Sequence, residues 1–410
     1  MSGVAGCGSR PGPAPSCPAW RMAYRPAAWL RGGVAGGMAA DGVLAGGAAA
    51  AVRVGESPAV WAGPLVREWQ APFPVDVRLT LSVHRRGRRD PAFRIDGDGA
   101  LWRTSLTPAG PATLRVISRH GLPPGSHGGP AAQDARPAQD ARPAQDVWLA
   151  RGGRLARGGP AGPASRGPLV IAAAWGPGAG WLLGTLPDML GAGDDSSGFL
   201  PAHPLLRRMA LRHAGMRIGR TGRVLEALVP AILEQKVVTA EAYRAWHWLL
   251  TRFGTPAPGP APAGMRVFPP PRVWASIPSW EWHRAGVEAV RARTIIAAAR
   301  AAGRLEETLS MDAAGAARRL RAIGGIGPWT VAEVRQRAAG DADAVSVGDA
   351  NLPAAVGWAL AGRVTDDAGM LELLAPYAGH RYRAARLILL SGVRPPRRGP
   401  RLAPRDYRRF

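Results

Sequence analysis

Hydrophobic and polar residues alternate along the first part of the chain. In residues 75–83, VDVRLTLSV, every second side chain is apolar, which is typical of a half-buried strand. Residues 93–106, FRIDGDGALWRTSL, place the DGDG sequence between two apolar runs and predict a hairpin, and residues 112–118, ATLRVIS, predict another strand. We therefore expect a β-rich, antiparallel domain over residues 65–190.

From about residue 200 the apolar residues follow a helical period, which predicts an all-α domain over residues 200–392. A long helical pattern runs from Pro230, because proline suits the first helical turn. Residues 289–303, AVRARTIIAAARAAG, predict a helix that ends at Gly303. Asp312 is expected to cap the helix that leads into a glycine-rich stretch.

Four segments show neither the alternation of a strand nor the period of a helix. Residues 1–64 are rich in glycine, alanine and proline, and we expect them to be disordered. Residues 131–146 hold tandem QDARPA units, which indicate a solvated insertion, with a partner-binding repeat as the alternative. Residues 191–199 read as a polar hinge, and residues 393–410 as a disordered basic tail. The fold class predicted is α+β: a β-rich N-terminal domain followed by an all-α domain.

The composition points to an anionic partner. The chain of 410 residues carries 53 basic and 29 acidic residues, a formal charge of +24, and Lys236 is its only lysine. This excess favours nucleic acid, although a solvated basic surface without a ligand is the alternative. Two cysteines, Cys7 and Cys17, exclude a four-cysteine iron–sulfur or zinc site and do not support a disulfide framework. No apolar run approaches the roughly 18 residues of a membrane span, so we expect a cytoplasmic, nucleoid-associated protein.

The stretch LRAIGGIGPWTVAEV, residues 320–334, carries the first chemical signal. Gly325 and Gly327 permit positive φ and the close approach of another backbone, and Pro328 fits the first position of a new helix. The free N–H groups of that helix start form an anion site, so Gly325, Ile326, Gly327 and Thr330 are expected to contact a DNA phosphate. The alternative is an ordinary corner between two helices.

This stretch and the loop after it resemble a known family. Helix, glycine hairpin and helix, followed by GDADAVSVGDANLP with Asp349 placed 22 residues beyond Gly327, resemble the HhH-GPD superfamily of DNA glycosylases. The earlier AILEQKV resembles the AILGQQVS-type helix of the DNA-3-methyladenine glycosylase II type, and the β-rich region resembles its N-terminal domain. The resemblance covers about residues 68–392. It implies base excision repair by flipping of a damaged base out of double-stranded DNA, by a monomer with no redox cofactor. A monovalent cation held by hairpin carbonyls is a family expectation.

The resemblance assigns Asp349 as the catalytic residue. A fixed carboxylate stabilises the positive charge that develops on the sugar when an N-glycosidic bond breaks, or orients the attacking water. The alternative is that Asp349 is a helix N-cap, before a helix that Asn351 could cap. Asp341 and Asp343 lie earlier in the same loop and are expected to be solvated.

Other positions refine the expected reaction. Relatives that also cut the backbone carry a Schiff-base lysine where this chain has Trp329, which implies a monofunctional enzyme. Trp329 is then a candidate wall of the base pocket, or an ordinary core tryptophan. Gln235 and Lys236 occupy the place where the family inserts a wedge into DNA, and are candidate DNA contacts or exposed helix residues. Glu234 reads as a surface residue or a partner in a helix ion pair.

Two features leave other functions open. Ala350 follows Asp349 where the family often has an aromatic residue, and the pocket aromatic of a late helix has no clear match, although Tyr377 and Tyr382 lie nearby. One alternative is a non-catalytic DNA-binding protein on the same scaffold. Another is a glycosylase for an oxidised or mismatched base.

Overall fold

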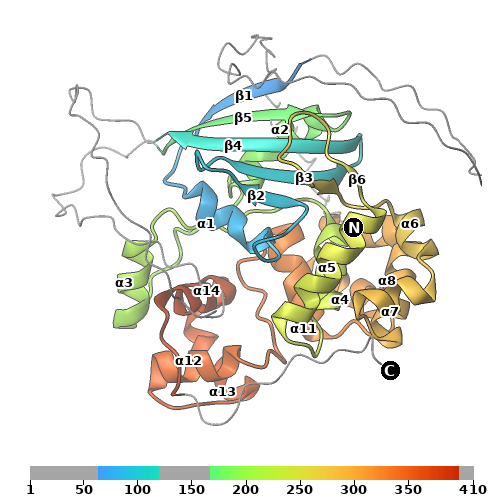
Figure 1. Cartoon of the computed structure of the whole chain (residues 1–410). Coiled ribbons are helices and arrows are strands. Elements are labelled where there is room, and N and C mark those ends of the chain that lie inside the picture. The colour runs from blue at the N-terminus through green and yellow to red at the C-terminus, as the bar shows by residue number, and fades with distance from the viewer. Residues whose placement is uncertain (1–62, 120–166, 397–410) are drawn as a thin grey trace, which may run out of the picture. The chain divides into compact units, whose positions relative to one another are not determined.

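A computed structural model describes residues 63–119 and 167–396 of the chain (Figure 1). The low-complexity segment, the repeat insertion and the basic tail lie almost entirely outside these residues, so those three predictions stay predictions. Across the described ranges, no helix is both long enough and apolar enough to cross a bilayer. The described residues form one antiparallel sheet of five strands and two groups of helices, which is the α+β class that the patterns predict.

The sheet has the strand order β1-β5-β4-β3-β2, with every neighbouring pair antiparallel. The predicted hairpin is present: β2 and β3 pair with Ile95 opposite Leu101, and Gly99 has a φ of +77° in the turn. The helix α2, Ala179–Met189, packs on β1, β4 and β5 and closes an apolar core under the sheet. The strands are β1 Leu65–Gln70, β2 Phe93–Ile95, β3 Leu101–Thr107, β4 Gly110–Arg119 and β5 Leu169–Trp175.

The strand expected at residues 75–83 is wrong, because these residues form helix α1, Val77–Leu81, and the 3-10 turn η1, Ser82–His84. Asp76 caps the helix: its Oδ1 accepts a hydrogen bond from the N–H of Leu79 at 2.8 Å. The buried residues of α1 are Val77, Thr80 and Leu81, a helical spacing. Over five residues, an alternating strand pattern and a helical face both place apolar residues at the two ends, here Val77 and Leu81. The cap by Asp76 therefore decides that the segment is a helix.

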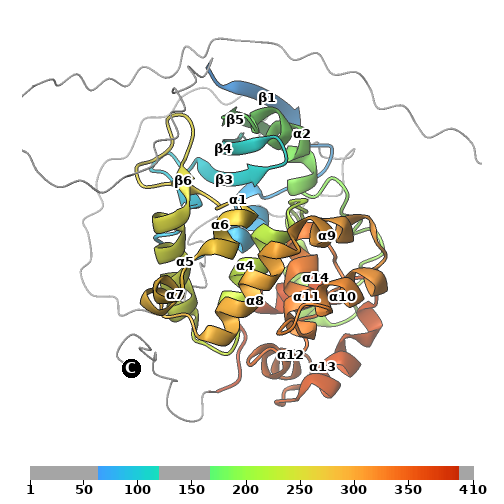
Figure 2. The same cartoon turned by 90° about the vertical axis from the view of Figure 1, so that its right-hand side faces the viewer.

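The first group of helices spans residues 224–339 and surrounds one apolar core (Figure 2). A short hairpin of β6 and β7 interrupts it and contacts β3 of the sheet. Its elements are α4 Val224–Leu233, α5 Thr239–Phe253, β6 Thr255–Pro256, β7 Arg266–Val267, α6 Pro271–Ser276, α7 Ser279–Ala285, α8 Ala289–Arg300, α9 Ala302–Glu306, η2 Glu307–Ser310, α10 Ala313–Arg321, α11 Pro328–Val334 and the π-helical turn η3 Arg335–Ala339.

The second group joins segments that are far apart in the sequence. Helix α3 packs with α14, and both share a core with α12 and α13. The expected hinge at residues 191–199 is fixed to this group, because Asp194 is buried in an ion pair with Arg383 of α14. The elements are α3 Pro204–Arg212, α12 Leu352–Ala361, α13 Asp367–Leu374, η4 Ala375–Tyr377 and α14 Arg381–Ser391. The chain therefore crosses between the two groups in the loop that contains Asp349.

Two predicted helix boundaries are wrong. Pro230 lies inside α4, which begins at Val224, because the carboxylate of Glu306 accepts hydrogen bonds from the N–H groups of Val224 and Leu225 and so caps the helix from outside. Helix α8 ends at Arg300, and α9 continues through the glycine that was expected to end it. A cap supplied by a residue some 80 positions away leaves no local pattern in the sequence.

Candidate active site

The glycine-rich turn between α10 and α11 holds its glycines in different conformations. Gly325 has a φ of +91°, and a Cβ there would lie 2.3 Å from Oγ1 of Thr294, so conformation and space both require glycine. Gly327 has a φ of −98° and a ψ of −178°, so it does not use the positive φ that glycine permits. A Cβ at Gly324 or Gly327 would meet no protein atom within 4 Å. No contact inside the described protein therefore explains a bare backbone at Gly327.

Free backbone N–H groups gather at this turn. Within the described ranges, the N–H groups of Gly325, Gly327, Trp329 and Thr330 donate no hydrogen bond, as is usual for the first turn of a helix. The side chains of Ile326 and Thr330 are buried, at 6% and 1% exposure. A ligand at this turn would meet main chain and not these two side chains.

The turn between α4 and α5 is tied to the hairpin by one amide. Nε2 of Gln235 donates to the carbonyl of Gly325 at 3.0 Å and to Oγ1 of Thr330 at 2.8 Å. Lys236, the next residue, is exposed and has a φ of +54°, the only positive φ at a non-glycine residue in the described ranges. The structure thus places Gln235 against the hairpin and Lys236 toward solvent beside it.

Asp349 joins the hairpin to helix α12. Its Oδ2 accepts a hydrogen bond from Nε1 of Trp329 at 3.1 Å. Its Oδ1 accepts from the N–H groups of Asn351 and Leu352 at 2.8 and 2.9 Å, so Asp349 caps the helix. The side chain of Asn351, the expected cap, makes no such bond. The carboxylate is partly exposed, with one oxygen at the helix start and the other at the indole.

The loop before Asp349 is held by ion pairs. Asp341 pairs with Arg335 at 2.5 Å, and Asp343 pairs with Arg381. Their side chains are 18% and 28% exposed, so the expectation that both are solvated is wrong. These pairs fix the loop at both groups of helices, since Arg335 follows α11 and Arg381 begins α14.

A cluster of charged side chains contacts the loop that leads to the candidate acid. Arg337 pairs with Glu333 at 2.7 Å, and Oε1 of Glu333 accepts a hydrogen bond from Ser346, three residues before Asp349. Burial lowers the pKa of Arg337, but the negative charge of Glu333 and the nearby oxygen of Tyr382 outweigh burial, and the pKa is raised. Tyr382, which the sequence could not place, therefore lies beside this cluster.

Glu234 belongs to the same cluster. Its Oε1 lies 2.9 Å from Nε of Arg86, and its side chain is 21% exposed. Burial raises the pKa of Glu234, Arg86 and Arg337 oppose this rise, and the charges of Glu333 and Asp349 add to it. Glu234 is therefore neither a surface residue nor half of a local helix pair. Its partner lies near α1, which no sequence spacing indicates.

No protein-family model matches the chain, and no curated protein matches it. Solved structures match most of its length. The 3-methyladenine DNA-glycosylase from Archaeoglobus fulgidus is 14% identical, with a TM-score of 0.56 over 79% of this chain and 96% of that chain. MBOgg1, solved with a low-affinity DNA ligand, is 14% identical, with a TM-score of 0.55 over 80% and 95%. The Clostridium acetobutylicum 8-oxoguanine glycosylase/lyase, solved with double-stranded DNA containing cytosine opposite 8-oxoG, is 9% identical, with a TM-score of 0.54 over 80% and 98%.

The chain has the fold of the helix-hairpin-helix DNA glycosylases. In this glycosylase fold, the hairpin of α10 and α11 and the loop to α12 lie where the sequence pattern predicts them. The identities are too low to assign a lesion or a reaction, so those conclusions depend on the site itself.

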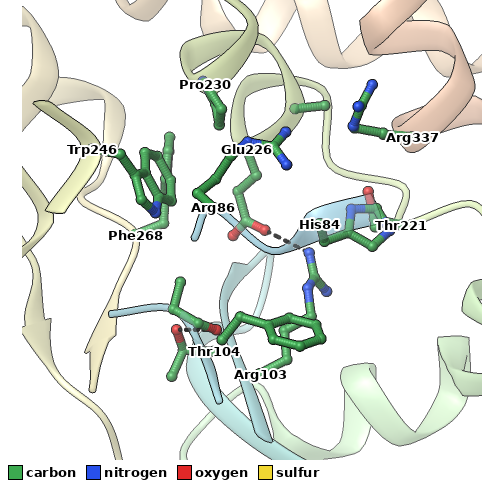
Figure 3. A pocket seen from close by; sticks show the side chains of 13 residues that line it. His84, Arg86, Arg103, Thr104, Thr221, Glu226, Pro230, Trp246, Phe268 and Arg337 are labelled. Atoms are coloured by element: carbon green, nitrogen blue, oxygen red, sulfur yellow. Dashed lines mark hydrogen bonds and ion pairs between the residues drawn. The ribbon is translucent and has the colours of Figure 1, made fainter. Parts of the chain in front are cut away.

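An inner cavity of about 40 Å³ lies between the sheet and the first group of helices (Figure 3). His84, Arg86, Arg103, Glu226 and Arg337 point into it, and neither Asp349 nor Trp329 lines it. This volume holds about three waters and is too small for a purine. It is therefore a polar interior space that the candidate acid does not line.

Proposed function

We propose that the protein is a monofunctional DNA N-glycosylase that excises alkylated purines and leaves an abasic site. The observation that carries the proposal is the position of Asp349, whose carboxylate is oriented by the hairpin indole on one oxygen and by two backbone N–H groups on the other. The carboxylate remains partly exposed, so a flipped nucleotide can reach it.

The chemistry follows from a negative charge held in a fixed place. When the bond between C1′ of the sugar and the base nitrogen breaks, positive charge develops on C1′ and its ring oxygen. The Asp349 carboxylate stabilises that charge without reorganising, since three hydrogen bonds already hold it. The cationic base leaves as a neutral base with the electron pair of the broken bond. A water oxygen bonds to C1′, and the water proton passes to Asp349 or to solvent.

The hairpin is the part of the protein that would bind the DNA backbone. The open space beside Gly327 and the free N–H groups of the turn suit a backbone phosphate, which is contacted without reading sequence. Lys236, exposed beside the hairpin, suits a second contact. The excess of positive charge over the whole chain favours association with DNA at low salt.

The proposal of a monofunctional enzyme rests on position 329. Bifunctional relatives need an amine there, and this chain has Trp329, whose N–H is engaged with Asp349. Lys236, the only lysine, lies in a different turn. We therefore propose base removal without strand cleavage.

The test is release of 3-methyladenine and 7-methylguanine from methylated duplex DNA by the full chain, compared with Asp349→Asn. Asparagine keeps an oxygen for the helix cap, so the fold should be kept while the rate falls about 100-fold or more. Asp98→Asn, the same change at an exposed residue in the β2–β3 turn, serves as the matched control and should keep wild-type activity.

Two outcomes would change the assignment. DNA binding without release of any base from a panel of alkylated, oxidised and mismatched duplexes would identify a non-catalytic DNA-binding protein. Release of 8-oxoguanine in place of methylated purines would move the enzyme to the oxidised-base class, a lesion named for one protein of the same fold.

A further inference from the structure

The turn between α4 and α5 sends three successive side chains to three different places. Glu234 pairs with Arg86, Gln235 bonds to the hairpin, and Lys236 is exposed. Lys236 takes a left-handed backbone conformation that costs a non-glycine residue of order 1 kcal/mol or more. Such strain persists where its surroundings fix the chain from both sides, and it gathers at functional sites. The strained backbone of this turn therefore indicates a functional role for its side chains.

Hydrogen bonds through the first turn of α11 connect the neighbour of Glu234 to the candidate acid. Gln235, its neighbour, bonds to Thr330, and Thr330 follows Trp329, whose indole holds Asp349. Burial raises the pKa of Glu234, and the negative charge of Asp349 adds a smaller contribution in the same direction. The turn that carries Glu234 is thus connected to the carboxylate of Asp349 through the first turn of α11.

One oxygen of Glu234 is available to a ligand. Oε1 is buried against Nε of Arg86 at 2.9 Å. No group in the described ranges donates a hydrogen bond to Oε2, and the side chain keeps 21% of its exposure. Arg86 is 7% exposed, so its guanidinium group holds the carboxylate from behind. A half-buried acceptor fixed in this way can receive a hydrogen bond from a base without rearranging.

The local charge is opposite to that of the whole protein. Glu234 is paired with Arg86 and Glu333 with Arg337, whereas neutral groups donate the hydrogen bonds that hold the Asp349 carboxylate. These three carboxylates and two guanidinium groups have an excess of one negative charge, on a chain of formal charge +24. A phosphate would be repelled from this place, whereas a cationic base would be attracted to it.

We propose that Glu234, held by Arg86, is a specificity residue of the base pocket: its free carboxylate oxygen accepts a hydrogen bond from the N–H edge of a cationic alkylated purine. This inference rests on the proposed glycosylase function. Both 7-methylguanine and 3-methyladenine carry N–H donors and a positive charge, so a carboxylate gains a charge-assisted hydrogen bond from either. A neutral purine can form the hydrogen bond but lacks the attraction between opposite charges, so Glu234 selects for the cation.

The experiment measures single-turnover excision by the full chain from two duplexes that differ only in one base, 7-methylguanine or hypoxanthine. The first base is cationic and the second neutral. For Glu234→Gln, which keeps the shape and removes the charge, we expect the rate on 7-methylguanine to fall about 10- to 100-fold. The rate on hypoxanthine should change less than about 3-fold. Glu68→Gln, the same change at an exposed residue of β1, should alter neither rate.

Each other result has a definite meaning. An equal loss on both bases would show that Glu234 only holds Arg86 in place and would overturn the inference. A loss confined to hypoxanthine would make Glu234 a proton donor to neutral bases, which also overturns it. If the wild type releases neither base, nor any other lesion of the panel, the proposed function itself fails. A cooperative melting transition and wild-type binding of undamaged duplex confirm that Glu234→Gln is folded, although its melting temperature should fall because Arg86 loses its partner.

Discussion

Replacing Trp329 by phenylalanine tests the contact on which the site depends. The indole N–H donates to Oδ2 of Asp349 at 3.1 Å, and the ring is partly exposed. Trp329→Phe keeps an aromatic ring at the start of α11 and removes the donor. If Trp329 orients the acid, the loss affects chemistry; if it is a stacking wall of the pocket, phenylalanine replaces most of its function.

The size of the effect follows from the bond that is lost. A hydrogen bond to a charged acceptor is worth about 1.5–3 kcal/mol, or roughly 10- to 150-fold in a rate if all of it acts in the transition state. Oδ1 keeps its two bonds to the backbone N–H groups at the start of α12, so part of the orientation of Asp349 survives. We therefore expect the lower end, about a 10-fold fall in the rate of excision.

Single-turnover kinetics on a duplex with one 7-methylguanine measure this rate, and fluorescence anisotropy measures the affinity for the same duplex. Trp329→Phe should lower the rate and leave the affinity within about 2-fold, whereas Trp329→Ala should lower both, because stacking is lost too. Trp280→Phe, at a tryptophan that is 62% exposed on α7, is the control. A rate for Trp329→Phe within 2-fold of wild type would refute the orienting role.

Three further predictions concern the molecule away from the indole. Asp194→Asn leaves Arg383 buried without its partner, so urea unfolding should show a fall of about 3–5 kcal/mol in the free energy of unfolding. Asp188→Asn, at an exposed ion pair, should lower it by less than about 1 kcal/mol, and equal losses would contradict the burial argument. Lys236→Ala should reduce the slope of log K against log salt for duplex binding by about 0.9, and Lys236→Arg should restore it; an unchanged slope for Lys236→Ala would remove this residue from the DNA contacts. Burial, followed by nearby guanidinium groups, lowers the pKa of His84 well below its usual value, so at about pH 6 the unfolded state binds a proton that the folded state does not. The free energy of unfolding is therefore unaffected by this group above pH 6.5 and falls on acidification below it. His84→Gln should reduce that fall between pH 6.5 and 5.5 by up to about 1.4 kcal/mol per pH unit.

The sequence predicts best where one residue decides the local structure. Asp312 caps α10 by accepting from the N–H of Gly315, as predicted, and Pro328 begins α11. The spacing from the hairpin to Asp349 also holds, since the acid meets Trp329 at the start of α11. In each case a single side chain or ring fixes a helix end, and that chemistry is visible in the sequence.

Prediction fails where distant residues decide. The start of α4 depends on Glu306, and the position of Glu234 depends on Arg86, whose partners come from separate parts of the chain. Composition works against such inferences here, because arginine is so common that no single guanidinium group stands out. The sequence therefore indicates the hairpin and the acid, and it gives no sign of the charged cluster behind them.

Asp349 also shows why capping and catalysis are not competing interpretations. From sequence, an aspartate just before a helix is either its cap or an active-site acid, and the two alternatives exclude each other only if the carboxylate has one use. The structure gives the cap to Oδ1, through Asn351 and Leu352, and leaves Oδ2 with a single donor, Trp329. The backbone N–H groups that bind Oδ1 also hold the negative charge in place, so the cap prepares the acid for the charge that develops at C1′.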